Sequence, residues 1–322
     1  MLRGPHLILG LVVLAGPALA VPACPQRPEA DTARNRIQEV MAKGRFVAYV
    51  PTALKVVDGR TTPADEASIR EDLKTLRPRF DGVITYSARD GIEWVPDVAA
   101  SLGFKAVIMG IWDPGNTAEV ANVAAAVTRN PGVVTGVSVG NEMVLGGRAD
   151  AAAVARAVQA VRARAPKLAV TTTEPFHLFL QPEFKPVLAQ IDLLLANVHP
   201  VFESWFRQRS DDDAAQFVIN ISKMLTGVYC GPVLVKETGV PTAPESAGYT
   251  AARQASFYRV LRGKFTASRD LAFAYFSAFD APWRANDAHP VAGAHPEEAY
   301  WGLYDAARNP KPVVAGIPEL PR

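Results

Sequence analysis

The chain has 322 residues, of which 49% are hydrophobic and 20% are charged, and its formal net charge is +2. This composition is typical of a globular protein with a sizeable core, and it excludes a disordered or strongly basic chain. Because no Lys/Arg block with interleaved aromatic residues occurs, we expect no nucleic-acid partner. The five histidines are scattered with no pair at metal-ligand spacing, so we expect no metal site and no cofactor.

The first 20 residues have the composition of a secretory signal peptide. Arg3 gives a positive start, residues 7–15 form a short apolar stretch, and Ala18-Leu19-Ala20 is an A-x-A cleavage signal. The apolar stretch is too short to span a bilayer comfortably. We therefore expect cleavage after Ala20 and a secreted or periplasmic protein with no membrane partner after the signal is removed.

The two cysteines leave two alternatives open. Residues 21–24 read Val-Pro-Ala-Cys, and as a lipoprotein cleavage box they would place a lipid anchor on Cys24, although Pro22 fits that pattern poorly. Outside the cytoplasm, Cys24 and Cys230 could instead form one disulfide. The sequence does not show whether the two residues come within bonding distance.

A short helix is expected in the N-terminal extension, residues 21–44, with Asp31 as its cap and an end near Gly44. A strand–helix rhythm then begins. Apolar runs predict strands at residues 46–50, 82–86, 105–111, 133–139, 168–173, 191–198, 233–235 and 271–279. Helical patterns lie between them at residues 65–76, 92–102, 117–128, 149–164, 183–190, 210–225 and 249–262. A further short helix is expected after Asp305.

The strand pattern indicates the fold class. The strands are nearly continuous apolar runs, which is typical of parallel strands covered on both faces. Eight strand–helix units on this length predict an α/β fold with a single (β/α)8 TIM barrel as the catalytic domain over residues 45–322. A doubly wound open sheet is the alternative, but no Gly-rich nucleotide loop follows the first strand.

In such a barrel the active site lies at the C-terminal ends of the strands. Two carboxylates stand there, Glu142 after the fourth strand and Glu237 after the seventh, on strands that face each other across the mouth. Glycoside hydrolysis needs such a pair, because one group protonates the leaving oxygen while the other attacks the anomeric carbon or activates water. Carboxyl groups about 5–5.5 Å apart would mean retention, and about 6.5–9.5 Å apart inversion.

Other side chains at the strand ends are candidates for sugar binding. Asn141 would donate to the sugar 2-hydroxyl, and aromatic rings would stack on sugar faces. The candidates at strand ends, besides Asn141, are Tyr86, Trp112, Asn197, His199, Asp280 and Trp283. A single Glu at a strand end is more often a solvated or helix-capping residue. For Glu174 two interpretations stay open: it lines the site, or it caps the segment that follows it.

Several stretches resemble motifs of glycoside hydrolase family 17, the β-1,3-glucanase family. They are VSVGNE (137–142), VLVKETGVPT (233–242), ANVHP (196–200), FSAFDAPWR (276–284), YWGLYDAARNPKP (300–312) and ITYSARDG (84–91). The resemblance spans nearly all of the chain after residue 45, and the GNE and ETGxP pair is its specific part. It implies net retention, with Glu142 as acid/base and Glu237 as nucleophile. It also implies that Tyr86, Asn141, Asp280, Arg284 and Glu298 bind or support the substrate.

The chain departs from the family pattern at three positions. Val240 stands where the family usually has an aromatic residue, Ala281 where many members have a further Glu, and Arg284 where those members have a Lys. The stretches AFDAPWR and AYWG are closer to the bacterial branch, some of whose members transfer glucan chains rather than hydrolyse them.

The sequence thus favours a secreted retaining glycoside hydrolase that cleaves β-1,3-glucan through a covalent glycosyl-enzyme. A β-1,3-glucanosyltransferase with the same residues is the close alternative. A glucan-binding barrel without turnover is a third, less favoured interpretation, because both glutamates are intact.

Overall fold

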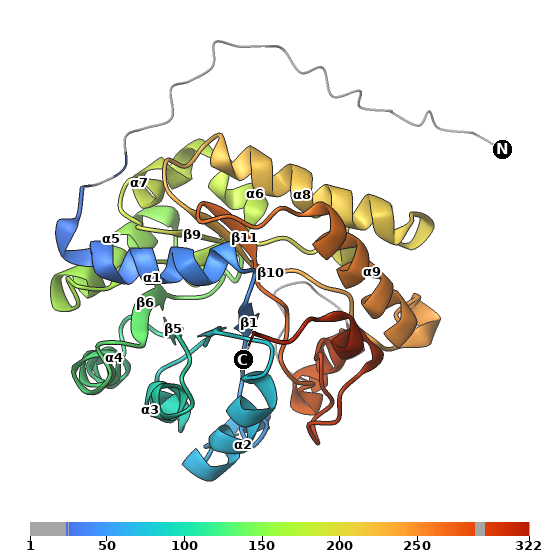
Figure 1. Cartoon of the computed structure of the whole chain (residues 1–322). Helices are drawn as coiled ribbons and strands as arrows, with labels where there is room; N and C mark the ends of the chain where they lie inside the picture. Colours follow the sequence, from blue (N-terminus) through green and yellow to red (C-terminus); the bar gives the residue numbers. More distant parts are fainter. Residues whose placement is uncertain (1–23, 25, 287–293, 322) are drawn as a thin grey trace.

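The computed structural model describes Cys24, residues 26–286 and residues 294–321 (Figure 1). The predicted signal peptide and the first three residues of the alternative lipoprotein box lie outside this part. No helix within the described ranges is long and apolar enough to cross a membrane.

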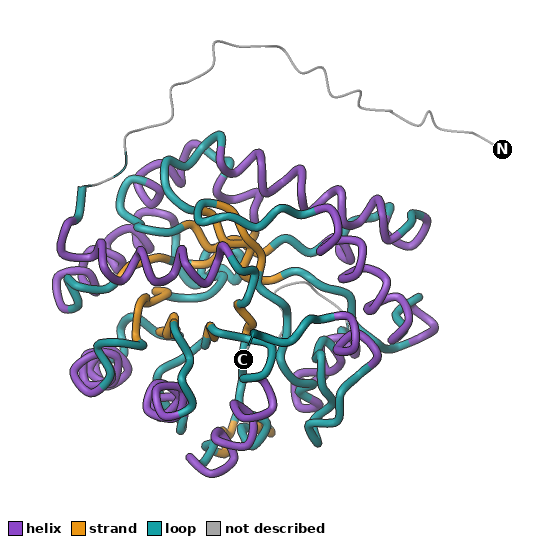
Figure 2. The backbone as a smooth tube through the Cα atoms, viewed as in Figure 1, coloured by secondary structure: helices purple, strands orange, loops and turns teal. Residues whose placement is uncertain are grey.

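Two parallel sheets lie at the centre of the molecule and are surrounded by helices (Figure 2). The first sheet has the spatial order β1 (Phe46–Ala48), β4 (Gly82–Ile84), β5 (Ala106–Ile111), β6 (Val134–Val139) and β7 (Ala169–Thr171). The second has the order β8 (Thr173–Pro175), β9 (Leu194–Asn197), β10 (Val233–Glu237) and β11 (Leu271–Phe273).

The two sheets connect at both ends. Only Thr172 separates β7 from β8, and the strand predicted at residues 168–173 covers β7 and the first residue of β8. At the other end, a parallel bridge joins Val47 to Tyr275, and the Ala48 N–H donates to the Tyr275 carbonyl at 2.9 Å. This strand order confirms the predicted α/β fold with the arrangement of a (β/α)8 barrel.

The helices form the outer layer, as Figure 1 shows. They are α2 (Glu66–Leu76), α3 (Val95–Ser101), α4 (Thr117–Arg129), α5 (Ala151–Arg164), α6 (Phe176–Phe179), α7 (Lys185–Leu188), α8 (Asp211–Thr226) and α9 (Ala251–Lys264). After β11 the outer layer contains 3-10 turns, Pro282–Asn286, Pro296–Tyr300 and Pro312–Gly316, and the last of these is the element expected after Asp305.

Side-chain oxygens set the starts of the longer helices. The Asp65 and Asp150 carboxylates accept backbone N–H groups at the starts of α2 and α5, and Asn116 does so for α4. At α8, Ser210 and Asp213 form a reciprocal capping box. The acidic run at residues 211–213 therefore belongs to a helix start, where negative charge complements the helix dipole.

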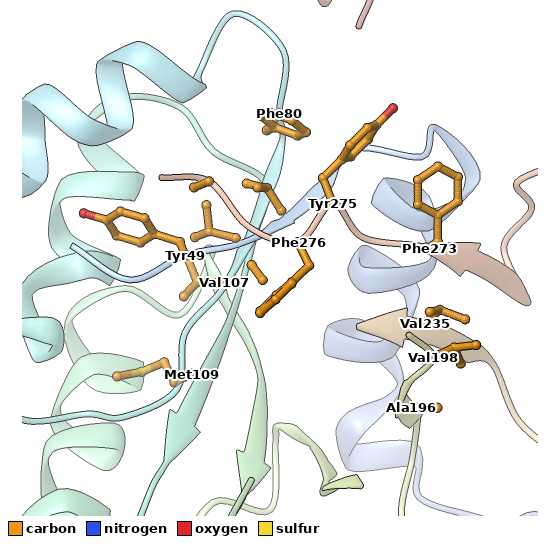
Figure 3. Packing of buried hydrophobic residues seen from close by; sticks show 14 of the residues in the cluster. Tyr49, Phe80, Val107, Met109, Ala196, Val198, Val235, Phe273, Tyr275 and Phe276 are labelled. Atoms are coloured by element: carbon orange, nitrogen blue, oxygen red, sulfur yellow. The ribbon is translucent and has the colours of Figure 1, made fainter. Parts of the chain in front are cut away.

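The strands divide their side chains between two apolar clusters, because successive strand residues point to opposite faces. Val47, Val83 and Val107 belong to the larger cluster, which packs against the helices, whereas Phe46, Ile84 and Ile108 belong to a smaller one. Figure 3 shows part of the larger cluster, with Tyr49, Val107 and Met109 on one side and Val235 and Phe273 on the other.

The N-terminal segment closes the smaller cluster. α1 (Asp31–Ala42) contributes Ile37, Val40 and Met41 to it, and Figure 1 shows this helix lying across the barrel. Ahead of α1, Cys24 forms a disulfide with Cys230, with 5.3 Å between their Cα atoms. Of the two alternatives for Cys24, the structure therefore contains the disulfide, and the described chain has no free cysteine.

Not every element was predicted. A hairpin of β2 (Lys55–Val57) and β3 (Arg60–Thr62) lies between β1 and α2. Its turn is Asp58-Gly59, and both residues have positive φ, 49° and 72°. The Asp-Gly pair favours this type of tight hairpin turn, so the sequence did contain a signal for it.

The disulfide gives a testable consequence for stability. It joins residues 206 positions apart, and a cross-link over a long loop restricts the unfolded chain. We expect the double variant Cys24→Ser/Cys230→Ser to unfold with a free energy about 2–4 kcal/mol smaller than that of the wild type, measured by urea denaturation. A reducing agent should lower the wild type to the level of the variant and leave the variant unchanged; equal midpoints without reductant would contradict this.

Candidate active site

A cleft of about 380 Å³ opens at the C-terminal ends of the strands. It contains both predicted catalytic glutamates, Glu142 and Glu237. The predicted binding residues that also line it are Tyr86, Trp112, Asn141, His199, Trp283, Arg284 and Glu298. The cleft therefore brings together side chains from strand ends that are far apart in the sequence.

Glu142 is presented by a tight turn directly after β6. Gly140 and Glu142 both have positive φ, 76° and 49°, so the chain reverses as soon as the strand ends. The Glu142 N–H donates to the Thr173 carbonyl at 2.8 Å, which ties the turn to the next strand. The side chain of Glu142 accepts a hydrogen bond from the Asn197 amide at 2.8 Å.

Glu237 lies one strand further on from Asn197 and is held by three partners. The Tyr86 hydroxyl donates to its Oε1 at 2.9 Å, and the Lys236 ammonium lies 3.1 Å from the same oxygen. His199 Nε2 lies 3.4 Å from Oε2. The carboxylate is nearly buried, and its contacts come from three different strand ends.

The surroundings push the two carboxyl groups in opposite directions. Burial raises the pKa of Glu142, and the negative charge of Glu237 raises it further, against the effect of the Asn197 hydrogen bond. Burial alone would also raise the pKa of Glu237, but the charge of Lys236, the His199 contact and Arg284 lower it to about 2. One carboxyl group is thus kept protonated more readily and the other ionised, which is the kind of separation that a division into acid and nucleophile requires.

Burial and the charge of Glu237 also raise the pKa of Tyr86 well above its ordinary value. Tyr86 therefore remains a neutral donor to Glu237. Glu298 forms an ion pair with Arg284 at 2.7 Å, and both residues line the cleft. These contacts fix the orientation of the polar wall.

Two predicted binding residues do not line the cleft. Asn197 is buried beneath it and reaches the substrate region only through Glu142. Asp280 accepts hydrogen bonds from Lys311 Nζ at 2.6 Å and from the Gly302 N–H at 2.8 Å. Both contacts lie within the C-terminal segment, so Asp280 links parts of the wall instead of facing the cleft.

The aromatic candidates differ in exposure. Trp112 is 41% exposed, and the Arg148 guanidinium lies over its ring at 4.7 Å. Trp283 is partly buried and packs against the larger apolar cluster. Trp112 therefore offers more ring surface to a ligand than Trp283 does.

A comparison with known protein families gives the identification. Residues 47–302 match the family model described as the BtgE/BtgC glycoside hydrolase domain. The chain belongs to this family. The expectation of a glycoside hydrolase or a related glycosyl-transferring enzyme is thereby confirmed.

Among curated relatives of this glycoside hydrolase is the glucan 1,3-beta-glucosidase of Arthroderma benhamiae. It is 27% identical over 265 residues, which cover 77% of this chain and 84% of the relative. The probable beta-glucosidase btgE of Aspergillus flavus is 29% identical over 248 residues, covering 74% of this chain but only 39% of that protein.

Solved structures support the fold. An active-site mutant of Rhizomucor miehei β-1,3-glucanosyltransferase in complex with laminaritriose is similar with a TM-score of 0.66 and 23% identity, covering 86% of this chain and 97% of the other. An endo-laminarinase from Formosa Hel1_33_131 is similar with a TM-score of 0.68 and 17% identity, covering 85% of this chain and 86% of the other. At these identities the similarity shows the barrel fold alone.

Several residues of the cleft of this glycoside hydrolase were not predicted. The hairpin contributes Val56 and Thr61, and Phe202, half exposed, lies beside His199 with 5.4 Å between the ring centroids. Lys236 was overlooked because it lies inside an otherwise apolar strand. A lysine in such a run, directly before a strand-end Glu, was the available signal.

Glu174 has a structural position. It is fully buried on β8, and its two oxygens accept the N–H groups of Val144 at 2.8 Å and Leu145 at 3.3 Å. It does not line the cleft. Neither interpretation left open by the sequence is correct: Glu174 does not line the cleft, and the N–H groups that it accepts belong to the turn that carries Glu142 and not to the segment after Glu174.

Glu174 predicts a specific pH dependence of stability. Burial raises its pKa to about 7, against the opposing effect of the two N–H groups. Because the folded protein binds this proton more tightly than the unfolded chain, the contribution is present at low pH and is lost as the pH rises through about 7. Through this group, the wild type should lose at most about 3 kcal/mol of unfolding free energy between pH 4 and pH 8. We expect Glu174→Gln not to show this loss.

The measurement is the free energy of unfolding in urea at several pH values. Glu183→Gln, at an exposed position, is the control and should follow the wild-type pH dependence. If Glu174→Gln and the wild type show parallel curves from pH 4 to pH 8, the assignment is wrong.

Proposed function

We propose that the protein is a retaining glycoside hydrolase of family 17 that cleaves β-1,3-glucan, with Glu142 as acid/base and Glu237 as nucleophile. The observation that carries this proposal is the pair of carboxyl groups in one cleft whose surroundings separate their pKa values. The motifs around both residues support the family assignment, and AFDAPWR and AYWG support its bacterial branch.

The substrate is proposed from the relatives and from the cleft. One curated relative is named a glucan 1,3-beta-glucosidase, and a similar fold belongs to a glucanosyltransferase in complex with laminaritriose. The cleft combines apolar ring surface with a few fixed polar groups, which is the surface that a sugar ring requires. Asn141 lines it next to Glu142, in the position expected for a partner of the 2-hydroxyl.

The proposed reaction has two steps. Protonated Glu142 gives its proton to the glycosidic oxygen while ionised Glu237 attacks the anomeric carbon, which breaks the glycosidic bond and forms a covalent glycosyl-enzyme. Glu142, now ionised, then takes a proton from an incoming hydroxyl, whose oxygen displaces Glu237. When water supplies that hydroxyl the reaction is hydrolysis, and two displacements retain the anomeric configuration.

A β-1,3-glucanosyltransferase is the second candidate. In that case a sugar hydroxyl replaces water in the second step. Trp112 and Phe202 favour it, because both are exposed by 40% or more and offer ring surface for an acceptor sugar near the cleft. A binding barrel without turnover is the third candidate, and the separated states of the two glutamates speak against it.

We further propose that the protein is secreted. Residues 1–20 have the composition of a signal peptide with cleavage after Ala20, and the Cys24–Cys230 disulfide fits an oxidising compartment.

The proposed roles of the glutamates can be tested by substitution and pH. Activity requires ionised Glu237 and protonated Glu142, so the acid limb of the pH profile reports Glu237 and the alkaline limb Glu142. We expect Glu142→Gln to lower kcat/KM on laminari-oligosaccharides by about 10²–10⁴-fold and to remove the alkaline limb. Glu237→Gln should bind the oligosaccharides but release no sugar, and exposed Glu183→Gln should match the wild type. Equal sugar release by Glu237→Gln and the wild type would refute the enzyme assignment.

Product analysis separates hydrolysis from transfer. The wild type is incubated with laminari-oligosaccharides labelled at the reducing end, and the product lengths are followed over time. Hydrolysis, the leading proposal, gives only products shorter than the substrate. Products longer than the substrate would instead establish the transferase, and loss of those products in Phe202→Ala with sugar release retained would assign the acceptor platform.

A further inference from the structure

Lys236 is a buried cation beside Glu237. It belongs to β10, directly before Glu237, and its side chain is 1% exposed. Lysine is almost never buried to this degree unless it is paired. Lys236 does not itself line the cleft, so it reaches a substrate only through its neighbours.

Its ammonium group contacts three strand ends. Nζ lies 2.6 Å from Asn141 Oδ1, which follows β6, and 3.1 Å from Glu237 Oε1. It also lies over the Tyr86 ring, 4.0 Å from the centroid, after β4. The ammonium therefore contacts Glu237, the nucleophile candidate, together with Asn141 and Tyr86 from two other strand ends.

The contact with Asn141 determines the orientation of its amide. An ammonium group has only donors, so it must face the carbonyl oxygen of the side chain. The NH₂ group of Asn141 consequently points away from Lys236. Asn141 lines the cleft, so an NH₂ group that points away from Lys236 can donate to a ligand bound there.

We propose that Lys236 is a positioning residue, whose single ammonium group both pairs with the Glu237 carboxylate and orients the Asn141 amide toward the sugar. The identity of the sugar rests on the proposed function, whereas the pairing itself does not. An apolar residue of similar length would leave the Glu237 carboxylate with one cation fewer and, because it has no donor, the Asn141 amide free to rotate.

The charges around the pair agree with this assignment. Burial lowers the pKa of Lys236, and the charges of Glu237 and Glu142 oppose that shift. The groups that face Glu237 from the other elements are His199, Tyr86, Arg284 and Glu142. Arg284 already forms an ion pair with Glu298, and burial raises the pKa of Glu142 and so favours its neutral form. Lys236 is therefore the main positive charge that offsets the negative charge of Glu237.

The first test measures the titration of the Glu237 carboxyl group directly by ¹³C NMR, with no substrate present. In Lys236→Met we expect the Glu237 titration to move up by at least about one pH unit, which corresponds to a tenfold change in proton affinity. Lys236→Gln, also neutral, should shift it in the same direction. Lys311→Met, which removes a partly buried lysine that pairs with Asp280, should leave the Glu237 titration unchanged.

An unshifted Glu237 titration in Lys236→Met would overturn the proposal. If Lys236→Met fails to fold, as judged by circular dichroism, Lys236→Gln decides on the same scale. Since this arm needs no turnover, wild-type protein that is inactive on β-1,3-glucan would remove the proposed function without deciding the role of Lys236.

The second test concerns Asn141. Asn141→Ala should lower kcat/KM about tenfold or more in the wild type, since one lost interaction of this kind is worth at least about one factor of ten. In the Lys236→Met background the same substitution should cost much less, because the amide is already misoriented. Lys236→Gln should keep part of the Asn141 effect, because its amide N–H still donates to Oδ1. Additive losses in Lys236→Met would contradict the orienting role.

Discussion

The arrangement of the site depends on one constraint, the negative charge of Glu237, which is held almost out of contact with water at the mouth of the barrel. Glu237 is nearly excluded from water, and an isolated buried carboxylate would neutralise itself. It stays ionised because Lys236, His199 and Tyr86 are brought to it from three elements. A buried charge is tolerated only with such partners in good geometry, so the strand ends must meet with little freedom.

Three further buried carboxylates limit that freedom by holding the loops after the strands. Asp72 on α2 accepts hydrogen bonds from the Tyr49 hydroxyl and the Thr52 N–H after β1, and also pairs with Arg308. Glu119 on α4 accepts four, from Ser87 and Ala88 after β4 and from Trp112 and Asp113 after β5. Glu174 on β8 holds the turn after β6 in the same way. Each of these acids thus binds the backbone or side chains of a neighbouring loop. Hydrogen bonds from backbone N–H groups to carboxylates are strong, so these acids make a rigid rim for the cleft.

The sequence predicted the elements better than the directions of side chains beyond them. Periodicity identified the barrel because each strand is covered on both faces, and the strand-end rule led to Glu142 and Glu237. The same rule selected Asn197 and Asp280, which lie outside the cleft. Asn197 still belongs to β9 and is buried, whereas Asp280 follows β11 in a loop whose backbone, and not the strand period, decides where its side chain points. The contacts of Lys236 and Glu174 were not predicted, for a related reason. Their partners come from other loops, and such contacts leave no pattern in one stretch of sequence.

Stability and chemistry are concentrated at opposite ends of this barrel. Partners and backbone turns with positive φ at the mouth hold ionisable groups in places that cost free energy. The other end carries a different set of constraints: α1 fills the smaller apolar cluster, the disulfide ties Cys24 to Cys230, and Arg27 reaches buried Asp192 and the Pro166 carbonyl. None of these residues lines the cleft. The strands run from one end of the barrel to the other, so stabilising contacts at the closed end can offset the free-energy cost of buried charge at the mouth. For the same reason, substitutions that loosen the N-terminal segment act on the active site only through the strands.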